Sequence, residues 1–558
     1  MSKRPLSPAT LPPSKRVHIS WDGAHESTPR RTFDTLLYDE LVLHIFSYLP
    51  WEDLCAVQAT NRNWFRLSAD NQLWKSLYLT EYGRSRLRGG RGFVGRTDGR
   101  EVKPLPGRAH SDEVKNWKAM FRISTNWRTG RCDISKVEDD MQALAQTGNA
   151  DIQTMNGAEQ QLAGKTHMLL TGHFTIIASS QPSISPAITF ISPTSHTTTI
   201  HAKCLRVQRP IQITALAVDQ SPPSTSFTRI AVCLSNGELQ VFEQHGVHLQ
   251  TSSRKHYYIP PARTPRTTPI LQVAYHHPVL ATLSEKFHLS IYDVSSESMK
   301  LTHCLTSFTC FPPASMVLSS PEPSTHRLVL TYASPVYPKH WSVGVTEVIL
   351  NSAPSSLHST SSDPASAIRL ISTRSTRAFD LPPGWLDTAK LAVLHEQWGR
   401  KVFEVAGTQT DGRWVILAPS DSVAPNTPST STTGILSPFS SMPLQLYRIS
   451  FPSATANSSA TPKLTFVRNL HGHTGPTAAL ALADGRCVSV GHDGSIWVWD
   501  LEAGTGAEVA PARDEEDEDS IESMEERWAL AAKATVVFDE RRIINAGVGG
   551  VVVRNFDI

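Results

Sequence analysis

The 558-residue sequence predicts an α + all-β protein, in which a short N-terminal helical module precedes a long all-β domain. Three observations support this fold class. Apolar residues follow a helical spacing within 33–80, short β-branched runs alternate with Ser-, Thr- and Pro-rich loops from residue 131 onward, and the chain is too long for one core. We expect four successive regions: a disordered tail at 1–31, a helical module at 32–80, a loop and linker helix at 81–130, and the all-β domain at 131–558.

The composition argues against several kinds of partner. Lys and Arg total 53 and Asp and Glu total 51, so the net charge of +2 creates no global attraction to nucleic acid or membranes. No apolar run approaches the ~20 residues of a membrane span, and the polar N-terminus does not resemble a secretory signal. The seven cysteines include no CxxC pair, which is typical of reduced intracellular thiols. We therefore expect neither nucleic acid nor membrane as a partner, and a location in the nucleus, the cytoplasm or both.

Residues 1–31 combine five prolines with basic residues and lack the apolar spacing that orders a chain. Lys3-Arg4 and Lys15-Arg16 form two small basic clusters, which resemble a bipartite nuclear-import signal. A solvated tail is the alternative interpretation of the same residues.

The helical module carries one apolar stripe at helical spacing. Its members are Leu37, Leu41, Val42, Ile45, Phe46 and Leu49. Pro50 ends this helix, and Asn61 and Asp70 can each cap a further short helix by accepting backbone N–H groups. The Gly- and Arg-rich stretch at 83–110 predicts a flexible, solvated loop, with phosphate or RNA contact as the alternative.

Four apolar alternations in the all-β region are each closed by an aromatic residue. They are Leu239–Glu243, Leu289–Asp293, Ile496–Asp500 and Val552–Asp557. Their ends lie about 50 residues apart, or multiples of that, which is the period of β-propeller blades. Weaker runs around 166–206, 307–350 and 390–449 bring the predicted number of blades to seven. Arg131–Val137 is the candidate strand that closes the ring, and Thr166–Thr171 is the alternative.

The segment from His473 to Asp500 resembles a WD repeat. Gly472-His473 precedes an apolar strand, and the sequence Ser-Val-Gly-His-Asp-Gly-Ser-Ile-Trp-Val-Trp-Asp follows it. In that family a His, a Ser or Thr, an Asp and a Trp form a buried hydrogen-bonded chain. The matching residues are His473, Ser489, Asp493 and Trp499, so the resemblance implies a WD-repeat-like β-propeller in which they stabilise one blade. A catalytic interpretation with Ser489 as nucleophile lacks the elbow and oxyanion-hole signatures of such enzymes.

Residues 36–78 resemble the F-box family in the order of their apolar, acidic and aromatic positions. The family usually has proline directly after the first leucine, where this chain has Tyr38. The resemblance implies that this module docks the Skp adaptor of an SCF ubiquitin ligase. The residues it assigns to that contact are Leu37, Glu40, Ile45, Phe46, Leu49, Leu54 and Val57. A helical bundle whose stripe packs only internally is the alternative.

The two motifs occur in one order, joined by Trp117-Lys-Ala-Met-Phe-Arg and Asn126-Trp-Arg-Thr-Gly130, as in F-box/WD-repeat proteins. That resemblance implies a non-catalytic substrate receptor without a cofactor. Its partners would be the Skp-type adaptor with cullin and RING subunits, and a protein target. Related propellers often hold phosphorylated targets through rim arginines. The propeller region contains Arg206, Arg209, Arg229, Arg327 and Arg413 among others, and without the blade registration none is assigned to a target site. A scaffold protein outside ubiquitin transfer is the second hypothesis.

Several local patterns resemble cofactor or metal motifs but do not support such a site, so we expect neither a cofactor nor a metal. Gly90–Gly95 matches GxGxxG but follows no predicted strand. His276-His277 and His471-Gly-His473 lack further Cys or His at zinc spacing. The acidic stretch at 511–526 predicts a solvated loop between the last two blades.

Overall fold

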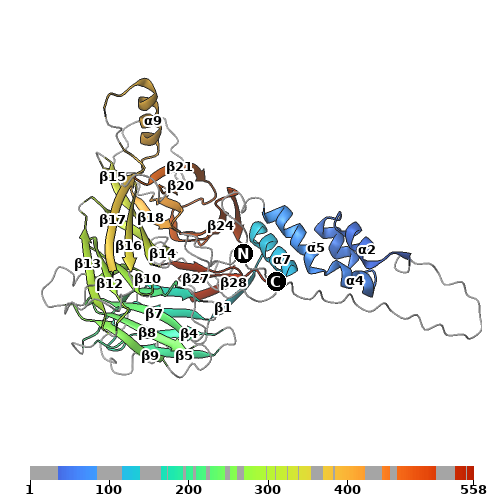
Figure 1. The fold of residues 1–558 in the computed structure, drawn as a ribbon, viewed down its shortest axis with the longest axis horizontal. Helices are drawn as coiled ribbons and strands as arrows, with labels where there is room; N and C mark the ends of the chain where they lie inside the picture. Colours follow the sequence, from blue (N-terminus) through green and yellow to red (C-terminus); the bar gives the residue numbers. More distant parts are fainter. Residues whose placement is uncertain are drawn as a thin grey trace, which may run out of the picture. The chain divides into compact units, whose positions relative to one another are not determined.

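The structure, a computed structural model, describes residues 36–83, 116–137 and 165–558 (Figure 1). The last range has gaps at 172–173, 193–195, 205–208, 222–226, 246–251, 261–268, 297, 308, 323, 337–338, 353–367, 381–383, 421–442, 453–460, 510–533 and 548–549. The predicted tail at 1–31, the Gly- and Arg-rich stretch from residue 84 and the acidic stretch at 511–526 lie outside the described residues. The chain divides into two compact units, Met1–Leu77 and Tyr78–Ile558. Over the part described, no helix is both long and apolar enough to span a bilayer.

The smaller unit is helical. It contains α2 (Asp39–Phe46), α3 (Trp51–Val57), α4 (Arg62–Ser68) and α5 (Asn71–Tyr78), whose last residue already belongs to the larger unit. The two predicted caps are confirmed. The Asn61 side chain accepts the N–H of Trp64 at 2.8 Å, and the Asp70 carboxylate accepts two N–H groups of α5 at 2.9 and 3.1 Å.

One small apolar core holds these helices together. Its buried members are Val42, Phe46, Leu54, Leu67, Leu73 and Trp74. The Phe46 ring meets Trp64 edge to face at 5.7 Å between centroids. The Trp74 indole N–H donates to the Ser68 carbonyl at 2.7 Å, which satisfies a polar group that the core would otherwise isolate.

The larger unit begins with a linker segment, which contains the π-helix η1 (Leu79–Gly83) and α7 (Trp117–Thr129). The Tyr82 ring lies 5.3 Å from that of Phe121, and the Tyr82 hydroxyl is 2.7 Å from the Thr125 hydroxyl oxygen. The predicted linker helix is therefore present, and it packs on η1 through aromatic side chains.

Helix α7 is anchored on the β domain by its last two turns. Trp127 stacks on Phe556 at 4.2 Å, and Asn126 donates its side-chain N–H to the Phe556 carbonyl at 2.8 Å. Gly130 then ends the helix with φ +71°, in the left-handed region that favours glycine. A Cβ at this position would overlap the carbonyl oxygen of Glu508. Both the backbone turn and the close approach therefore require glycine.

Within the described residues, seven four-stranded antiparallel sheets form the blades. The first blade contains β2 (Thr166–Leu170), β3 (Thr175–Ser179), β4 (Ala187–Ile191) and β5 (Thr197–His201). The second contains β6 (Ile213–Val218), β7 (Phe227–Leu234), β8 (Leu239–His245) and β9 (Ser252–Tyr258). The third contains β10 (Ile270–His276), β11 (Val279–Ser284), β12 (His288–Asp293) and β13 (Lys300–Thr306).

The fourth blade has the longest strands, β14 (Phe311–Glu322), β15 (Thr325–Val336), β16 (His340–Ser352) and β17 (Ile368–Arg377). The fifth contains β18 (Val405–Thr410), β19 (Trp414–Pro419), β20 (Leu444–Ser450) and β21 (Lys463–Leu470). The sixth contains β22 (Thr477–Ala483), β23 (Arg486–Gly491), β24 (Ile496–Asp500) and β25 (Thr505–Val509). The seventh contains β26 (Thr535–Phe538), β27 (Arg542–Gly547), β28 (Gly550–Asn555) and β1 (Asp133–Val137).

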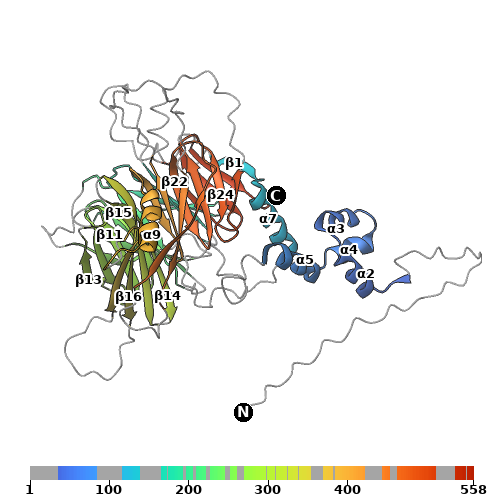
Figure 2. The same cartoon turned by 90° about the horizontal axis from the view of Figure 1, so that it is seen from above.

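The sheets form a closed ring, because the innermost strands β2, β6, β10, β14, β18, β22 and β26 contact one another in cyclic order. The blades follow one another around this ring in Figure 1, and Figure 2 shows the same domain turned by 90°. The ring closes where β1 pairs antiparallel with β28, from Asp133 opposite Asn555 to Val137 opposite Val551. The first candidate closing strand is thus confirmed, whereas residues 166–170 form the innermost strand of the first blade. Pairing the two ends of the domain leaves neither β28 nor β1 without a partner in the sheet.

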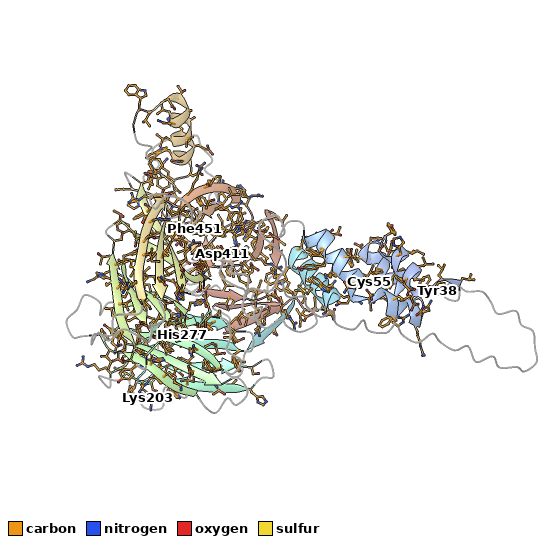
Figure 3. The ribbon with its side chains drawn as sticks, in the orientation of Figure 1. Tyr38, Cys55, Lys203, His277, Asp411 and Phe451 are labelled. Atoms are coloured by element: carbon orange, nitrogen blue, oxygen red, sulfur yellow. The ribbon has the colours of Figure 1, made fainter. Side chains whose placement is uncertain are left out.

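The core lies between neighbouring blades. Ile416 and Leu446 of the fifth blade pack with Leu482 and Trp499 of the sixth. A polar contact crosses the same boundary, since the buried carboxylate of Asp411, labelled in Figure 3, accepts the N–H of Gly485 at 2.9 Å.

The prediction that residues 131–558 are all β is wrong at one segment. Residues Thr388–Gly399 form helix α9, between β17 and β18. The Asp387 side chain caps this helix by accepting the N–H of Lys390 at 2.8 Å, and the run that follows is rich in Ala and Leu, which favour helix. The blades predicted around 307–350 and 390–449 exist, but their strands extend over Phe311–Arg377 and Val405–Leu470.

Candidate docking site

Helix α2 has an apolar surface that its own module does not cover. Val42 and Phe46 point into the core, and the adjacent face, about 100° around the helix, exposes Leu41 by 49% and Ile45 by 42%. Tyr38 and Tyr48, just beyond the two ends of the helix, extend this exposed row and are 79% and 75% exposed. Tyr38 is labelled in Figure 3. Tyr38, Leu41, Ile45 and Tyr48, here called the outer stripe, lie at helical spacing on one face.

Sequence reasoning assigned Leu41, Val42, Ile45 and Phe46 to a single stripe, and the structure divides them between two faces. The apolar arc of α2 is wide enough to serve both the module's core and a second contact. The two tyrosines were not among the predicted docking residues. Tyr38 lies three residues before Leu41 and Tyr48 three residues after Ile45, and this helical spacing would have placed both on the same face.

Polar groups surround the outer stripe. Asp39 and Glu40 occupy the exposed first turn of α2, and Arg66 of α4 forms an ion pair with Asp39 at 2.5 Å. The Tyr48 hydroxyl lies 3.4 Å from the Nε2 atom of His44. An apolar centre with a polar rim is the usual composition of a protein interface.

Tyr38 occupies the position where the F-box family usually has proline. Its backbone has φ −71°, within the range that a proline ring would impose. The chain therefore keeps a proline-compatible conformation at the start of α2 and adds an exposed aromatic ring there.

The seven residues predicted to dock an adaptor fall into two groups. Five of them reach the surface of the module, with Glu40 and Ile45 exposed and Leu37, Leu49 and Val57 half-buried. Phe46 and Leu54 are 3% and 0% exposed and belong to the core. These two can influence docking through the fold of the module, because their side chains offer almost no surface to a partner.

The four residues of the predicted blade tetrad come together in the sixth blade. The Ser489 hydroxyl oxygen lies 2.6 Å from His473 Nε2 and accepts the Trp499 indole N–H at 2.8 Å. Asp493 joins them through Ser495, a residue that sequence reasoning did not include. The Ser495 hydroxyl donates to Asp493 at 2.6 Å and lies 3.1 Å from His473 Nδ1.

These contacts fix the protonation of His473. Because Ser495 uses its single proton on Asp493, it accepts from Nδ1–H, and Nε2 accepts from the Ser489 hydroxyl. Burial lowers the pKa of His473 to about 4, which is consistent with a neutral imidazole. Ser489 is 0% exposed, so its hydroxyl cannot reach a substrate and serves the packing of the blade.

The arginines considered for binding phosphate are mostly committed to carboxylates. Arg206 lies outside the described residues, and Arg209 is exposed. The other three each form an ion pair at 2.9 Å: Arg229 with Glu243, Arg327 with Glu347, and Arg413 with Glu502. An arginine whose charge is balanced in this way is a poor receptor for a phosphorylated motif.

A cavity of about 330 Å³ lies at the centre of the propeller. Residues from all seven innermost strands contribute to its wall, among them Ala406, Gly407 and Thr477. Lys165 is the cation of this lining, and burial lowers the pKa of the neighbouring His167 to about 4. The described wall contains no carboxylate.

Comparison with protein families agrees with this two-part organisation. A family model described as F-box-like matches residues 39–80, which include α2 to α5. A second model, described as F-box protein pof12 beta-propeller, matches residues 174–540, more than half of the chain. The chain belongs to this F-box propeller family. The predicted F-box followed by a seven-bladed propeller is thereby confirmed.

Solved structures match this F-box propeller at low identity. The β-propeller domain of Myceliophteria thermophila Cps50 (Swd1) has 10% identity and a TM-score of 0.37, with 72% of this chain and 99% of that chain covered. A complex of KlAtg21 with the coiled-coil of AgAtg16 has 12% identity and a TM-score of 0.36, with 70% and 93% covered. YCF48 bound to a D1 peptide has 7% identity and a TM-score of 0.34, with 71% and 92% covered. The propeller fold is therefore assigned from the seven four-stranded sheets of the described residues and not from these matches.

Proposed function

We propose that this F-box propeller is the substrate receptor of an SCF-type (Skp–cullin–F-box) ubiquitin ligase. The helical module binds the Skp-type adaptor, which connects it to cullin and RING subunits, and the propeller binds the target. The chain contributes no catalytic group in this mechanism. It raises the effective concentration of target lysines near the site of ubiquitin transfer.

The outer stripe of α2 is the observation that carries this proposal. Four large side chains with apolar surface are exposed on or directly beside this short helix, and three of them, Leu41, Ile45 and Tyr48, lie within residues 39–80, which match the F-box-like family. Contiguous exposed apolar surface of this kind marks interaction sites in folded proteins. A module this small also gains stability by burying such a surface against a partner.

Replacement of Leu41 and Ile45 by Asp tests the proposal. Both side chains are exposed, so the module stays folded while a docked apolar contact would bury two charges. We expect the full-length double variant to lose co-purification with the Skp-type adaptor and cullin. Phe65→Asp is the matched control, because Phe65 is 56% exposed on α4 and lies outside the outer stripe.

Undiminished adaptor binding by the double variant contradicts the assignment. The alternative hypothesis, a scaffold protein outside ubiquitin transfer, makes a different prediction for the unmodified chain. It predicts that neither a Skp-type adaptor nor cullin co-purifies with it. Circular dichroism of each variant shows whether the helices are intact.

A further inference from the structure

Helix α9 is an insertion that its own domain barely buries. Of its twelve residues only Leu394 is buried, whereas Leu391, Val393 and Trp398 are 40%, 51% and 37% exposed. The helix projects beyond the ends of β15 and β17 (Figure 1). An isolated helix of twelve residues is only marginally stable in water, so α9 would gain stability from a partner.

The segments on both sides of α9 add further apolar surface. Trp385 and Leu386 precede the helix and Phe403 follows it, and Trp385 is exposed by 88%. Together these residues define the α9 surface: Trp385, Leu386, Leu391, Val393, Trp398 and Phe403. Leu391 and Val393 are about 200° apart around the helix. Apolar groups on opposite sides suit insertion into a groove better than contact with a flat surface.

The base of this insertion is held in place. Trp341 of β16 and Val402 exchange two backbone hydrogen bonds, of 2.7 and 2.9 Å. The ring of Phe403 lies 4.7 Å from that of His340, and Trp398 lies 6.0 Å from the same imidazole. The α9 surface therefore starts from a fixed position at the long fourth blade.

Cations outnumber acids by one in the segment 374–404, with five Lys and Arg residues against four Asp and Glu residues, and Lys339 adds a cation beside His340. Asp387 caps the helix, and Glu396 forms an ion pair with Arg400 at 2.7 Å. The remaining acids of the described segment 374–404 are Asp380 and Glu404. Four cations of the α9 region form no ion pair with a described residue. They are Lys339, Arg377, Lys390 and Lys401. A partner with apolar side chains and an excess of acids would complement this surface.

The same surface leads to the central cavity. Phe403 lies three residues before Ala406, which lines the cavity together with Gly407. On the neighbouring strand, Phe311 packs against Trp341 at 5.4 Å, and Pro313 lines the cavity two residues later. The edge of the α9 surface at Phe403 therefore lies only three residues from the wall of the central cavity.

We propose that α9 is the target-docking element, which inserts into a groove on a target protein formed by apolar and acidic side chains. This inference rests on the proposed function, because the partner is the protein to be ubiquitylated.

Leu391→Glu with Val393→Glu is the variant that tests the inference. It is expressed as the full chain in cells that lack the native copy, and ubiquitylated proteins are quantified by mass spectrometry. Ile45→Asp, which disables adaptor docking, defines the proteins that depend on the receptor. We expect the α9 variant to lose ubiquitylation of the same proteins while it still co-purifies with the adaptor. Lys339→Glu with Lys401→Glu should weaken the same set, and Ile184→Glu, at a side chain 63% exposed in another part of the propeller, should not.

Unchanged ubiquitylation of those proteins in the α9 variant overturns the inference and leaves the proposed function intact. If Ile45→Asp loses the adaptor yet alters no protein's ubiquitylation, the proposed function fails, and the inference fails with it. Two further measurements address other occupants. The purified chain is tested for flotation with phosphatidylserine vesicles and for self-association in analytical ultracentrifugation. If either occurs and the α9 variant abolishes it, the assignment of α9 to a target is overturned. We expect neither.

Discussion

Leu41 and Val42 are neighbours in the chain, yet Leu41 is 49% exposed and Val42 is 1% exposed. One residue of α2 therefore belongs to a surface and the next belongs to the core. The two can be altered separately, which distinguishes docking from folding.

Val42→Ala should destabilise the helical module by about 2 kcal/mol, because it removes buried methyl groups and leaves a cavity. Leu41→Ala should change its stability by no more than about 0.5 kcal/mol, because the side chain is half in solvent. Hydrogen exchange of peptides from α2 to α4 in the full chain measures both effects. Equal acceleration of exchange in the two variants would contradict the division of α2 into two faces.

Ser489→Ala should destabilise the propeller by about 2–4 kcal/mol. The change leaves the Trp499 indole N–H and His473 Nε2 without their buried partner. Thermal unfolding should shift to lower temperature, and adaptor co-purification at a temperature where the chain is folded should not change. Ser495→Ala is the control with a smaller expected effect, since Ser495 is only half-buried. A Ser489 variant as stable as the unmodified chain would rule out the structural role of the tetrad.

Acid should weaken the propeller as the pH falls below about 6.5. Burial lowers the pKa of His167, His326 and His473 to about 4, from about 6.5 in the unfolded chain. These groups stay neutral when folded, so their contribution is fully present above about pH 6.5 and is lost as the pH falls towards 4. For His473 alone the loss at pH 5 is about 2 kcal/mol. Thermal unfolding between about pH 7.5 and 5 tests this, and a His473→Gln variant should depend less on pH.

Gly130→Ala should detach or distort the end of α7. The new methyl group would require a left-handed alanine and would overlap the Glu508 carbonyl oxygen. Gly384→Ala is a matched control, because Gly384 has φ +85° and no atom within 4 Å of an added Cβ. We expect limited proteolysis or hydrogen exchange to show opening of residues 116–137 in the first variant only. Similar protection in both would mean that the close approach at Gly130 contributes little.

The sequence predicted those parts of the fold that have a local chemical signature. The cap residues Asn61 and Asp70 and the His473–Trp499 segment each carry their partners within a few residues or one blade. The closing strand also followed from a general requirement, since a ring needs a partner for its last strand.

Helix α9 lacked such a signature. A helix that buries only Leu394 shows no regular apolar period, and periodicity was the signal used to find helices. Ser495 was missed for another reason. The family pattern names Asp493, and only the geometry shows that a hydroxyl stands between Asp493 and the imidazole of His473.

The pairing of β1 with β28 has a consequence for synthesis. The ribosome makes Asp133–Val137 early, and the strand that pairs with it, Gly550–Asn555, more than 400 residues later. Until then β1 has no partner in its sheet, and the ring stays open between its first and last blades. Completion of the propeller must therefore follow synthesis of Gly550–Asn555, and loss of that strand would leave β1 and β27 each with an open edge.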